Sequence, residues 1–345
     1  MNTSSSASPL VVVLVGPTAS GKTALLDALF GSPEAREAYG LPAAEVVRAD
    51  SMQAYRGMDI GSAKPDTALL ARLPHRLIDI RDICEQYTVG DFVALADSAC
   101  DEIAAAGKLP VVSGGAGFYV RNFICGLPTA PASEPRTRAE VARDLEAKGA
   151  EALRGELAAV DPDSAARIHA NDLYRLTRAL EIVRISGRPM ADFAPASAPR
   201  PRFRFATFGV KRAREEVIAR INERVDAMMD AGLAEEILSL RKAGAVSGDP
   251  GMQAIGYREF FETEAAGAAF GDNSGLASLA EAVKRDTRRY AKRQMTFFRN
   301  LPGIDWIGPD PAALADALAA RIRDALRGSR GPGVGAIVQA GSSGL

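Results

Sequence analysis

The stretch GPTASGKT, residues 16–23, follows directly on the apolar run LVVVLV of residues 10–15. The pattern G-x-x-x-x-G-K-[ST] between a buried strand and a helix is typical of a phosphate-binding loop. Its glycines let backbone amides surround an anion, and the helix that begins near Gly21 adds its positive end. Lys22 supplies a cation for phosphate oxygens, and the Thr23 hydroxyl is placed to bind Mg²⁺. We expect a diphosphate or triphosphate to contact Gly16, Pro17, Thr18, Ala19, Ser20, Gly21, Lys22 and Thr23.

Short apolar runs and helix-period segments alternate along much of the chain. They predict an α/β fold, a P-loop NTPase-like core with a parallel sheet. The helix between the third and fourth strands is expected at 89–106, before Gly107. Strands are expected at 11–15, 45–49, 76–80, 110–113 and 203–210, with a last one near 304–307.

Two Pro/Ala/Ser-rich linkers, GLPTAPASEP and APASAPRPR, bound a segment with helical patterns and no convincing strand. We interpret this segment, 126–201, as a helical insertion domain. The core is then discontinuous, formed by 10–125 and 202–327. Ser/Gly-rich composition predicts flexible tails at 1–9 and 328–345. The segment 30–41 receives no functional interpretation.

Composition limits the class of protein. The chain has 345 residues, 47% of them hydrophobic and 25% charged, which is typical of a soluble globular protein. Three scattered cysteines without a C-x-x-C pair argue against a disulfide framework or a structural zinc site, so a reducing cytoplasm is expected. No signal peptide or membrane span is evident. A net charge of −1 argues against indiscriminate nucleic-acid binding.

The segment ADSMQAYRGMDIGSAKP, 49–65, follows the second expected strand. Asp50 at the carboxyl end of that strand is expected to face the phosphate-binding loop. Its pattern alone leaves three roles open: a Mg²⁺ ligand, a general base, or a turn former. Gln53, Tyr55 and Arg56 offer an amide, an aromatic ring and a guanidinium group suited to a nucleobase and its phosphates.

At this point the sequence resembles the bacterial tRNA dimethylallyltransferases, also called tRNA isopentenyltransferases. The resemblance covers residues 10 to about 300, and its segments occur in the family's order. They are GPTASGKT, ADSMQAYRGMDIGSAKP, PHRLIDI, YTVGDFV, PVVSGGAGFYVRNFICGLP, YRLTRALEI, INERVDAMMDAGL, GMQAIGY and RRYAKRQMTFFRN. The resemblance implies a P-loop core with a helical insertion. It also implies transfer of a dimethylallyl group from dimethylallyl diphosphate to N6 of the adenosine just 3′ of the anticodon in tRNA.

The resemblance implies a role for each part of the site. Asp50 matches the family's general base, which would take the proton of the adenine amine. Lys22 and a Mg²⁺ near Thr23 would stabilise the departing diphosphate. Arg220 is expected to face the diphosphate, whereas Arg224 is expected to face solvent on an amphipathic helix with the apolar stripe Val217, Ile218, Ile221, Val225 and Met228.

Contacts with tRNA are implied in several segments, and the chain is expected to act as a monomer. The segment 284–299 holds seven Lys or Arg residues against one Asp, and Arg285, Arg288, Arg289 and Lys292 share one side of a helix. Such a ridge suits phosphate contacts. The residues implied to contact tRNA are Asp50, Ser51, Met52, Gln53, Ala116, Arg138, Tyr174, Arg175, Leu176, Thr177, Arg178, Met252, Gln253, Ala254, Ile255, Gly256, Tyr257, Lys292, Arg293, Gln294, Met295, Thr296, Phe297, Phe298 and Arg299.

The role of Tyr257 stays open, and the residue at position 116 departs from the family's usual pattern. Tyr257 is compatible with stacking on a base or with packing in the core. Ala116 stands where the family's usual pattern has threonine, which removes one hydrogen bond. His75 and His169 have no metal-ligand partner at helical spacing and are interpreted as structural or polar surface residues.

Three other functions are compatible with parts of the sequence. A small-molecule kinase would use the phosphate-binding loop for ATP, but it leaves the basic segment without a role. A prenyltransferase for free adenine nucleotides would need neither YRLTR nor that segment. A non-enzymatic RNA-binding protein would tolerate loss of Asp50.

Overall fold

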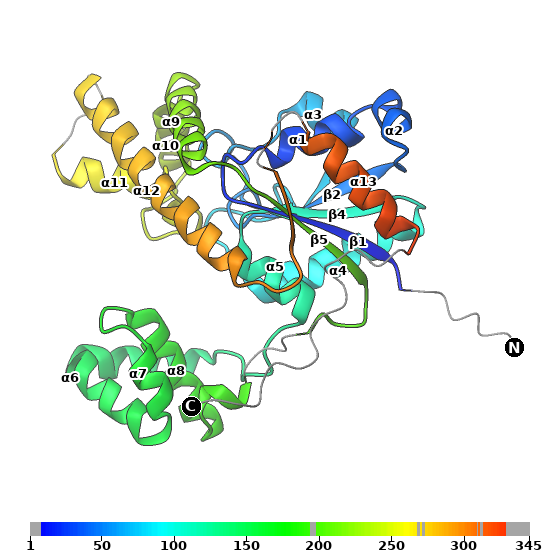
Figure 1. Cartoon of the computed structure of the whole chain (residues 1–345). Helices are drawn as coiled ribbons and strands as arrows, with labels where there is room; N and C mark the ends of the chain where they lie inside the picture. The colour runs from blue at the N-terminus through cyan, green and yellow to red at the C-terminus, as the bar shows by residue number, and fades with distance from the viewer. Residues whose placement is uncertain are drawn as a thin grey trace, which may run out of the picture. The chain divides into compact units, whose positions relative to one another are not determined.

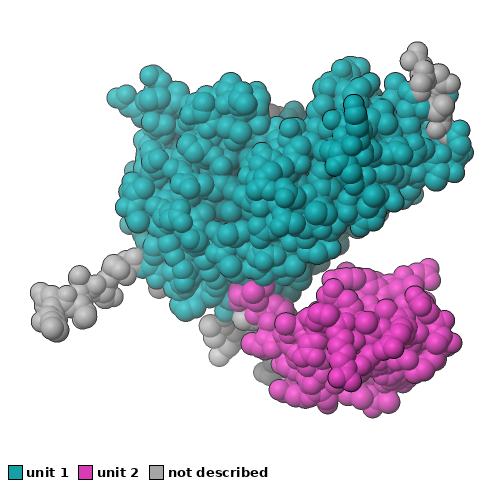
Figure 2. Space-filling model, turned by 180° about the vertical axis from the view of Figure 1, so that it is seen from behind, with its two compact units in different colours: residues 1–124, 198–345 teal, residues 125–197 magenta. Residues whose placement is uncertain are grey.

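A computed structural model describes residues 8–328, apart from 194–197, 268–269, 271–272, 309 and 311–312. It divides into two compact units (Figure 2): unit 1, Met1–Ile124 with Ala198–Leu345, and unit 2, Cys125–Ser197. The expected tails lie largely outside the described residues. Of the expected first tail, Ser8 and Pro9 are described, and the Pro9 carbonyl accepts a hydrogen bond from the Arg204 amide.

Unit 1 is built on a parallel six-stranded sheet with the order β3-β2-β4-β1-β5-β6. Val12 in β1 lies between Val111 of β4 and Ala206 of β5, so the central strand joins distant parts of the chain. The α/β prediction is confirmed. The strands are β1 Leu10–Val15, β2 Ala44–Ala49, β3 His75–Arg76, β4 Leu109–Gly114, β5 Arg204–Val210 and β6 Asp305–Ile307.

The expected strand at 76–80 is wrong beyond its first residue, because β3 ends at Arg76. Leu77 and Asp79 have positive φ angles of 67° and 56°, which no strand accommodates. The chain turns there toward the segment after β2, and the Asp79 amide donates to the Gln53 carbonyl.

Helices cover both faces of the sheet. Figure 1 shows α1, α2 and α13 on one face and α4 and α5 on the other. Leu26, Leu29, Leu318 and Ile322 pack with the strands on the first face. The helices of unit 1 are α1 Lys22–Phe30, α2 Pro33–Tyr39, α3 Thr67–Arg72, α4 Val89–Ala105, α5 Gly117–Cys125, α9 Arg214–Asp230, α10 Leu233–Lys242, η2 Gly251–Gln253, α11 Arg258–Ala265, α12 Asn273–Arg299 and α13 Leu314–Leu326.

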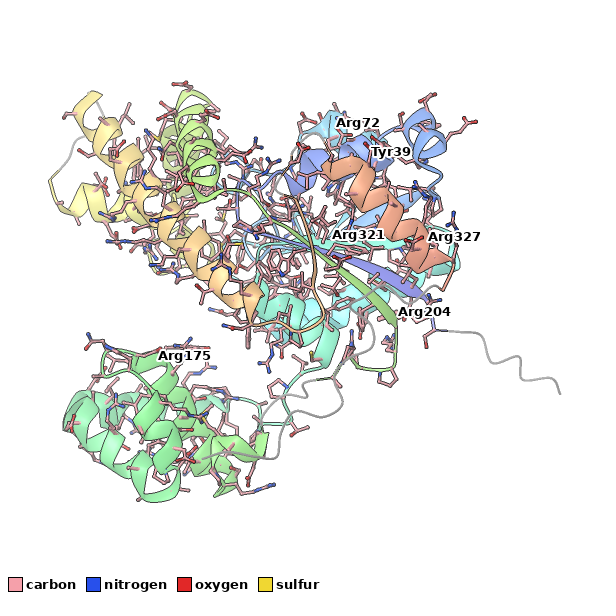
Figure 3. The ribbon with its side chains drawn as sticks, viewed as in Figure 1. Tyr39, Arg72, Arg175, Arg204, Arg321 and Arg327 are labelled. Atoms are coloured by element: carbon pink, nitrogen blue, oxygen red, sulfur yellow. The ribbon has the colours of Figure 1, made fainter. Side chains whose placement is uncertain are left out.

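The segment 30–41, which had no functional interpretation, contains the short helix α2. Ser32 caps its first turn by accepting from the Ala35 amide, and Gly40 ends it at a φ of 61°. Tyr39 at its end packs against the core beside α13 (Figure 3), and its carbonyl accepts from Arg323. This segment therefore extends the core.

Unit 2 contains helices and no strand among its described residues, 125–193. Its core holds Val141, Leu153, Leu157, Leu176 and Leu180. The helices are α6 Pro135–Val160, which is broken at Gly149, α7 Pro162–Arg167, α8 Leu173–Ser186 and η1 Met190–Phe193. Unit 2 thus lies within a few residues of the insertion expected between the two Pro-rich linkers.

Candidate functional site

The phosphate-binding loop connects β1 to α1. The Lys22 ammonium donates to the carbonyls of Gly16 and Pro17, each at 2.9 Å. Lys22 is buried, and burial together with nearby Arg48 and Arg224 lowers its pKa to about 7, against an opposing effect of Asp50. A cation held so far from water gains most from a ligand that brings negative charge.

Three arginines reach this loop: Arg212, which precedes α9, and Arg220 and Arg224 within α9. Arg212 Nε donates to the Ser20 carbonyl at 2.6 Å, and Arg220 Nε donates to the Ala19 carbonyl at 2.8 Å. The guanidinium groups of both lie close to Gly21, where an added Cβ would be 3.2 Å and 3.5 Å from their nitrogens. Arg220 therefore lies beside the phosphate-binding loop, which is compatible with the diphosphate contact that the resemblance implies.

Arg224 does not face solvent, so that expectation is wrong. Its Nη1 lies 3.5 Å from Thr18 Oγ1, and its side chain lines a cavity together with Asp50. Burial and the neighbouring Arg220 lower its pKa. The signal was the spacing of Arg220 and Arg224, because residues four apart share a helix face and both turn to the loop once one does.

Asp50 follows β2 and lines the same cavity, of about 300 Å³. Its Oδ1 accepts from the Met52 amide at 2.9 Å and from the Gln53 amide at 3.3 Å. In the described part of the chain no group donates to Oδ2. One carboxylate oxygen thus holds the turn, while the other is left for a ligand.

The sheet brings Asp50 to the phosphate-binding loop through a close approach of strands. A Cβ added at Gly114, the last residue of β4, would lie 1.9 Å from the Ala49 carbonyl oxygen. Glycine is therefore required there. Ala116, two residues on, donates its amide to the same Ala49 carbonyl at 3.2 Å. As a residue without a hydroxyl, it makes no side-chain hydrogen bond.

Gln53 is buried and supports the loop after Asp50, so its side chain does not line the cavity wall as a base-reading amide. Its Nε2 donates to the Ser62 and Ala63 carbonyls, and its Oε1 accepts from Arg48 Nε at 2.8 Å. Tyr55 is also buried, and Arg56 pairs with Asp82 outside the cavity.

Helix α12 lines the cavity with a different face from the one the basic ridge predicted. The cavity contacts Val283, Thr287, Tyr290 and Arg293. Burial and Asp50 raise the pKa of Tyr290 to about 12, so its hydroxyl stays protonated. The sequence analysis missed Tyr290, which the three- and four-residue spacing of this face would have indicated.

The ridge residues themselves are largely neutralised or engaged elsewhere. Arg285 and Arg289 both contact Asp286, at 2.8 Å and 3.1 Å, and Arg288 Nη1 donates to Asn222 at 2.7 Å. Lys292 is exposed and has no ion pair among the described residues.

Side chains at the end of α12 contact the phosphate-binding loop and the segment after β4, so they do not form a single exposed surface. Gln294 is buried; its Oε1 accepts from the Thr18 amide at 2.8 Å, and its Nε2 donates to the Gly115 carbonyl at 2.9 Å. Phe298 is fully buried, and Phe297 packs on Gly117, where a Cβ would lie 2.4 Å from its ring. The side chains of Gln294 and Phe298 are thus unavailable for a surface contact.

The segment 252–257 divides between core and cavity. Met252 and Tyr257 are fully buried, so the core alternative for Tyr257 is the one observed. Ala254 and Ile255 line the cavity with Gln253, whose amide also donates to the Ser247 carbonyl. Expected contacts of RNA with the Met252 and Tyr257 side chains are therefore not supported.

In unit 2, the segment YRLTR lies at the start of α8. Tyr174 is 80% exposed, whereas Leu176 is buried in the core of this unit and so cannot contact RNA through its side chain. Arg175, labelled in Figure 3, pairs with Asp172 at 2.6 Å. A second cavity, of about 420 Å³, is lined by Ser164, Arg167, Ile168, Tyr174, Arg175, Arg178 and Met190.

The other cations predicted in unit 2 are tied to its own residues. Arg178 contacts Glu181 at 3.0 Å and the Pro131 carbonyl at 2.6 Å. Arg138 donates to Ser133 Oγ at 2.8 Å. Both still have exposed parts, so they can contribute positive charge to this surface.

The two histidines are placed as structural and surface residues. His75 Nδ1 lies 2.7 Å from the Leu73 carbonyl, and burial lowers the pKa of its ring to about 4. His169 is exposed. Among the described residues no group of three His, Cys, Asp or Glu side chains could hold a metal ion, and no helix is long and apolar enough to cross a membrane.

The sequence is similar to one protein family and to its curated members over most of the chain. A family model described as IPP transferase matches residues 53–301. A tRNA dimethylallyltransferase of Geobacter sulfurreducens is 42% identical over 299 residues, covering 86% of this chain and 91% of the relative. One from Geobacillus thermodenitrificans is 40% identical over 309 residues, covering 88% and 92%.

Solved structures resemble the chain over most of its length. The full-length tRNA isopentenylpyrophosphate transferase of Bacillus halodurans is 33% identical, with a TM-score of 0.65 and coverage of 93% of this chain and 98% of that one. A eukaryotic dimethylallyltransferase acting on tRNA has a TM-score of 0.71 at 24% identity, covering 93% and 79%, which shows a shared fold.

Proposed function

The chain belongs to the IPP transferase family, and from this membership we propose that it is a tRNA dimethylallyltransferase. It transfers the dimethylallyl group of dimethylallyl diphosphate to N6 of the adenosine just 3′ of the anticodon, releasing diphosphate. The observation that carries the proposal is the shared cavity: Asp50 lines it beside Arg224 and Thr18 of the phosphate-binding loop. A carboxylate and an anion site next to each other suit a reaction that removes a proton and a diphosphate together.

The donor diphosphate would occupy the phosphate-binding loop. Lys22, the loop amides and Arg220 would bind its oxygens. Arg224 would lie on the side of the diphosphate that faces the cavity. The carbon–oxygen bond to the diphosphate breaks as the bond from N6 to that carbon forms. Positive groups preorganised at the leaving group stabilise the charge that develops there.

Asp50 would accept the N6 proton during this step through its free carboxylate oxygen. The adenine amine is nearly non-basic, so its proton must leave as the new bond forms. Extrusion of the base from the anticodon loop would bring N6 into the cavity. The apolar side chains of Val225, Met228 and Ile255 there suit a five-carbon prenyl group.

A Mg²⁺ ion fits this donor set, because Thr23 offers a hydroxyl oxygen and the diphosphate supplies further oxygens. Mg²⁺ in phosphate sites usually has one or two protein ligands and completes its shell with substrate oxygens and water. When bound, it would neutralise part of the diphosphate charge. We further propose that the protein works in the cytoplasm as a monomer.

The test incubates the purified protein with unmodified tRNA and labelled dimethylallyl diphosphate, with and without Mg²⁺. Label should move to tRNA, and digestion should locate it at the adenosine 3′ of the anticodon. Phosphate transfer from ATP without prenyl transfer would instead indicate a kinase. Label transfer to free adenine nucleotides in preference to tRNA would indicate the related nucleotide enzymes.

Replacing Asp50 by Asn tests the general base. We expect the single-turnover rate to fall by at least about 10²–10⁴-fold, the usual contribution of a positioned base. Binding of tRNA, followed by filter retention, should change little. An Asp50→Asn enzyme with near-normal turnover would remove the base assignment while leaving the transferase assignment intact.

A further inference from the structure

A short loop, residues 59–63, forms the side of the cavity that also contains Asp50. Gly61, Ser62 and Ala63 line the cavity directly. Any displacement of this loop would change the space in which an acceptor base must meet the carboxylate. How the loop is held is therefore relevant to the reaction.

The carboxylate of Glu236 in α10 holds the first three residues of this loop. Glu236 Oε2 accepts from the amides of Asp59 and Ile60 at 2.9 Å and 2.8 Å, and Oε1 accepts from the Gly61 amide at 3.3 Å. Hydrogen bonds from amides to an ionised carboxylate are stronger than those between neutral groups. Three consecutive amides are thus fixed to a single side chain.

Tyr257 orients this carboxylate. Its hydroxyl donates to Glu236 Oε1 at 2.6 Å, and its ring is packed so closely on Gly61 that an added Cβ would lie 2.5 Å from it. Burial and the Glu236 carboxylate raise the pKa of Tyr257, so the hydroxyl remains a donor. With this fourth donor, the lone pairs of the carboxylate are fully used.

The opposite edge of the loop is fixed as well. Gln53 donates to the carbonyls of Ser62 and Ala63 at 3.0 Å and 3.1 Å, and it is itself held by Arg48. Gln53, three residues after Asp50, and Glu236 of α10 therefore hold the loop 59–63 from two sides. These two attachments hold the loop relative to Asp50, and Lys64 Nζ adds a contact with Asp59 Oδ1 at 2.7 Å.

We propose that Glu236 is a positioning residue of the transfer reaction: oriented by Tyr257, it fixes the 59–63 side of the acceptor cavity relative to Asp50. This rests on the proposed function for the identity of the reaction. Glu236 does not line the cavity, and it acts through the backbone of the loop. The buried hydroxyl of Tyr257 acts on Glu236 and not on RNA.

The expected consequence concerns the rate of the chemical step rather than binding of the donor. Displacing reacting groups by about 1 Å costs on the order of 100-fold in rate. The phosphate-binding loop has no contact with Glu236 among the described residues, so affinity for diphosphate should stay unchanged. A general loss of stability would alter both properties together.

The experiment compares Glu236→Gln and Tyr257→Phe with Glu235→Gln in the full-length protein. Glu235 is an exposed neighbour on the same helix, so its replacement removes the same charge without touching the loop. Each variant is assayed by single turnover at saturating tRNA and donor, and by calorimetric titration with inorganic diphosphate. Hydrogen exchange of a peptide covering residues 56–65 measures the amides that Glu236 holds.

We expect Glu236→Gln to lose about 10- to 100-fold in single-turnover rate, with Tyr257→Phe losing less, because a misplaced loop misaligns the acceptor. Diphosphate affinity should stay within twofold, and the 56–65 amides should exchange faster only in these two variants. A Glu236→Gln enzyme with a wild-type rate would overturn the proposal, as would a parallel loss of diphosphate affinity. If the wild-type protein transferred no prenyl group, the proposed function would fail, while the exchange data would still test the attachment.

Discussion

The cations of α12 and those around the phosphate-binding loop differ in what neutralises them. On α12, Arg285 and Arg289 share Asp286, and Lys284 pairs with Asp226 at 2.6 Å. In the loop region, Lys22 donates to carbonyls and Arg224 to a threonine hydroxyl, and neither forms an ion pair among the described residues.

Arg48 strengthens the contrast. Its side chain is buried in β2, and its Nε donates a hydrogen bond to Gln53 Oε1. In the described part of the chain its Nη1 has no hydrogen-bond partner. Burial lowers its pKa, and Asp50 opposes that effect. Part of the dense charge visible in the sequence is thus compensated, and near the loop Arg212 pairs with Glu216. Lys22, Arg48 and Arg224 have no ion pair among the described residues, so they offer uncompensated positive charge to a diphosphate.

Among these cations, the largest effect should come from removing Arg224, which is half-buried at the cavity. We expect Arg224→Ala to lower kcat/KM for dimethylallyl diphosphate by about 10²–10³-fold, because it removes a preorganised charge at the leaving group. Arg289→Ala, which removes a cation already paired with Asp286, should change this value less than twofold. Equal losses in both variants, measured with labelled donor, would break the comparison.

A smaller effect should follow from titration of Lys22. Its pKa of about 7 lies below the usual lysine value, so the ammonium loses its proton as the pH rises through 7 and must regain it to bind diphosphate. Donor affinity should therefore fall by up to about tenfold per pH unit between pH 7.5 and 9, where the terminal phosphate is already ionised. Below pH 7 this dependence should vanish.

Calorimetric titration in two buffers of different ionisation enthalpy measures the proton taken up on binding. Lys22→Arg should bind without this proton uptake, because arginine stays charged throughout the range. Proton release, or an affinity that rises with pH in the wild-type protein, would contradict the assignment.

The smallest effect is expected on the surface of α12. Lys292→Gln should weaken tRNA binding a few-fold and reduce the salt slope by about 0.7, the value for one phosphate contact on a single strand. Arg289→Gln should reduce the slope by less, since Asp286 already neutralises it. Filter binding at several salt concentrations would measure both slopes, and a larger effect at Arg289 would reverse the comparison.

Much of the fold could be predicted from local pattern. Buried apolar runs marked β1, β2, β4 and β5 within about one residue at each end, and the Pro-rich linkers marked the insertion. The third strand failed at Leu77 because its positive φ comes from a turn that only the fold requires. Apolar periodicity carries no information about such a turn.

The candidate site was predictable where a motif fixes position, as for Lys22 and Asp50. It was not predictable where the partner is distant in sequence: Gln294 bonds to Thr18, and Tyr257 bonds to Glu236 across a helix boundary. The family resemblance implied RNA contact for Gln294 and Tyr257, and the core alternative was left open for Tyr257. Both side chains are buried and bond to other residues of the protein.

The pairing of β1 with β5 also bears on how the chain is made. The central strand β1 has both neighbouring strands only after Ala206, the partner of Val12 in β5, has been synthesised. At about 5–20 residues per second, a ribosome needs on the order of ten to forty seconds to supply that partner. During this interval unit 2 emerges complete, with its own core of local helices. Its early folding would shorten the span that the sheet must close, so the insertion can serve the nascent chain as well as the finished enzyme.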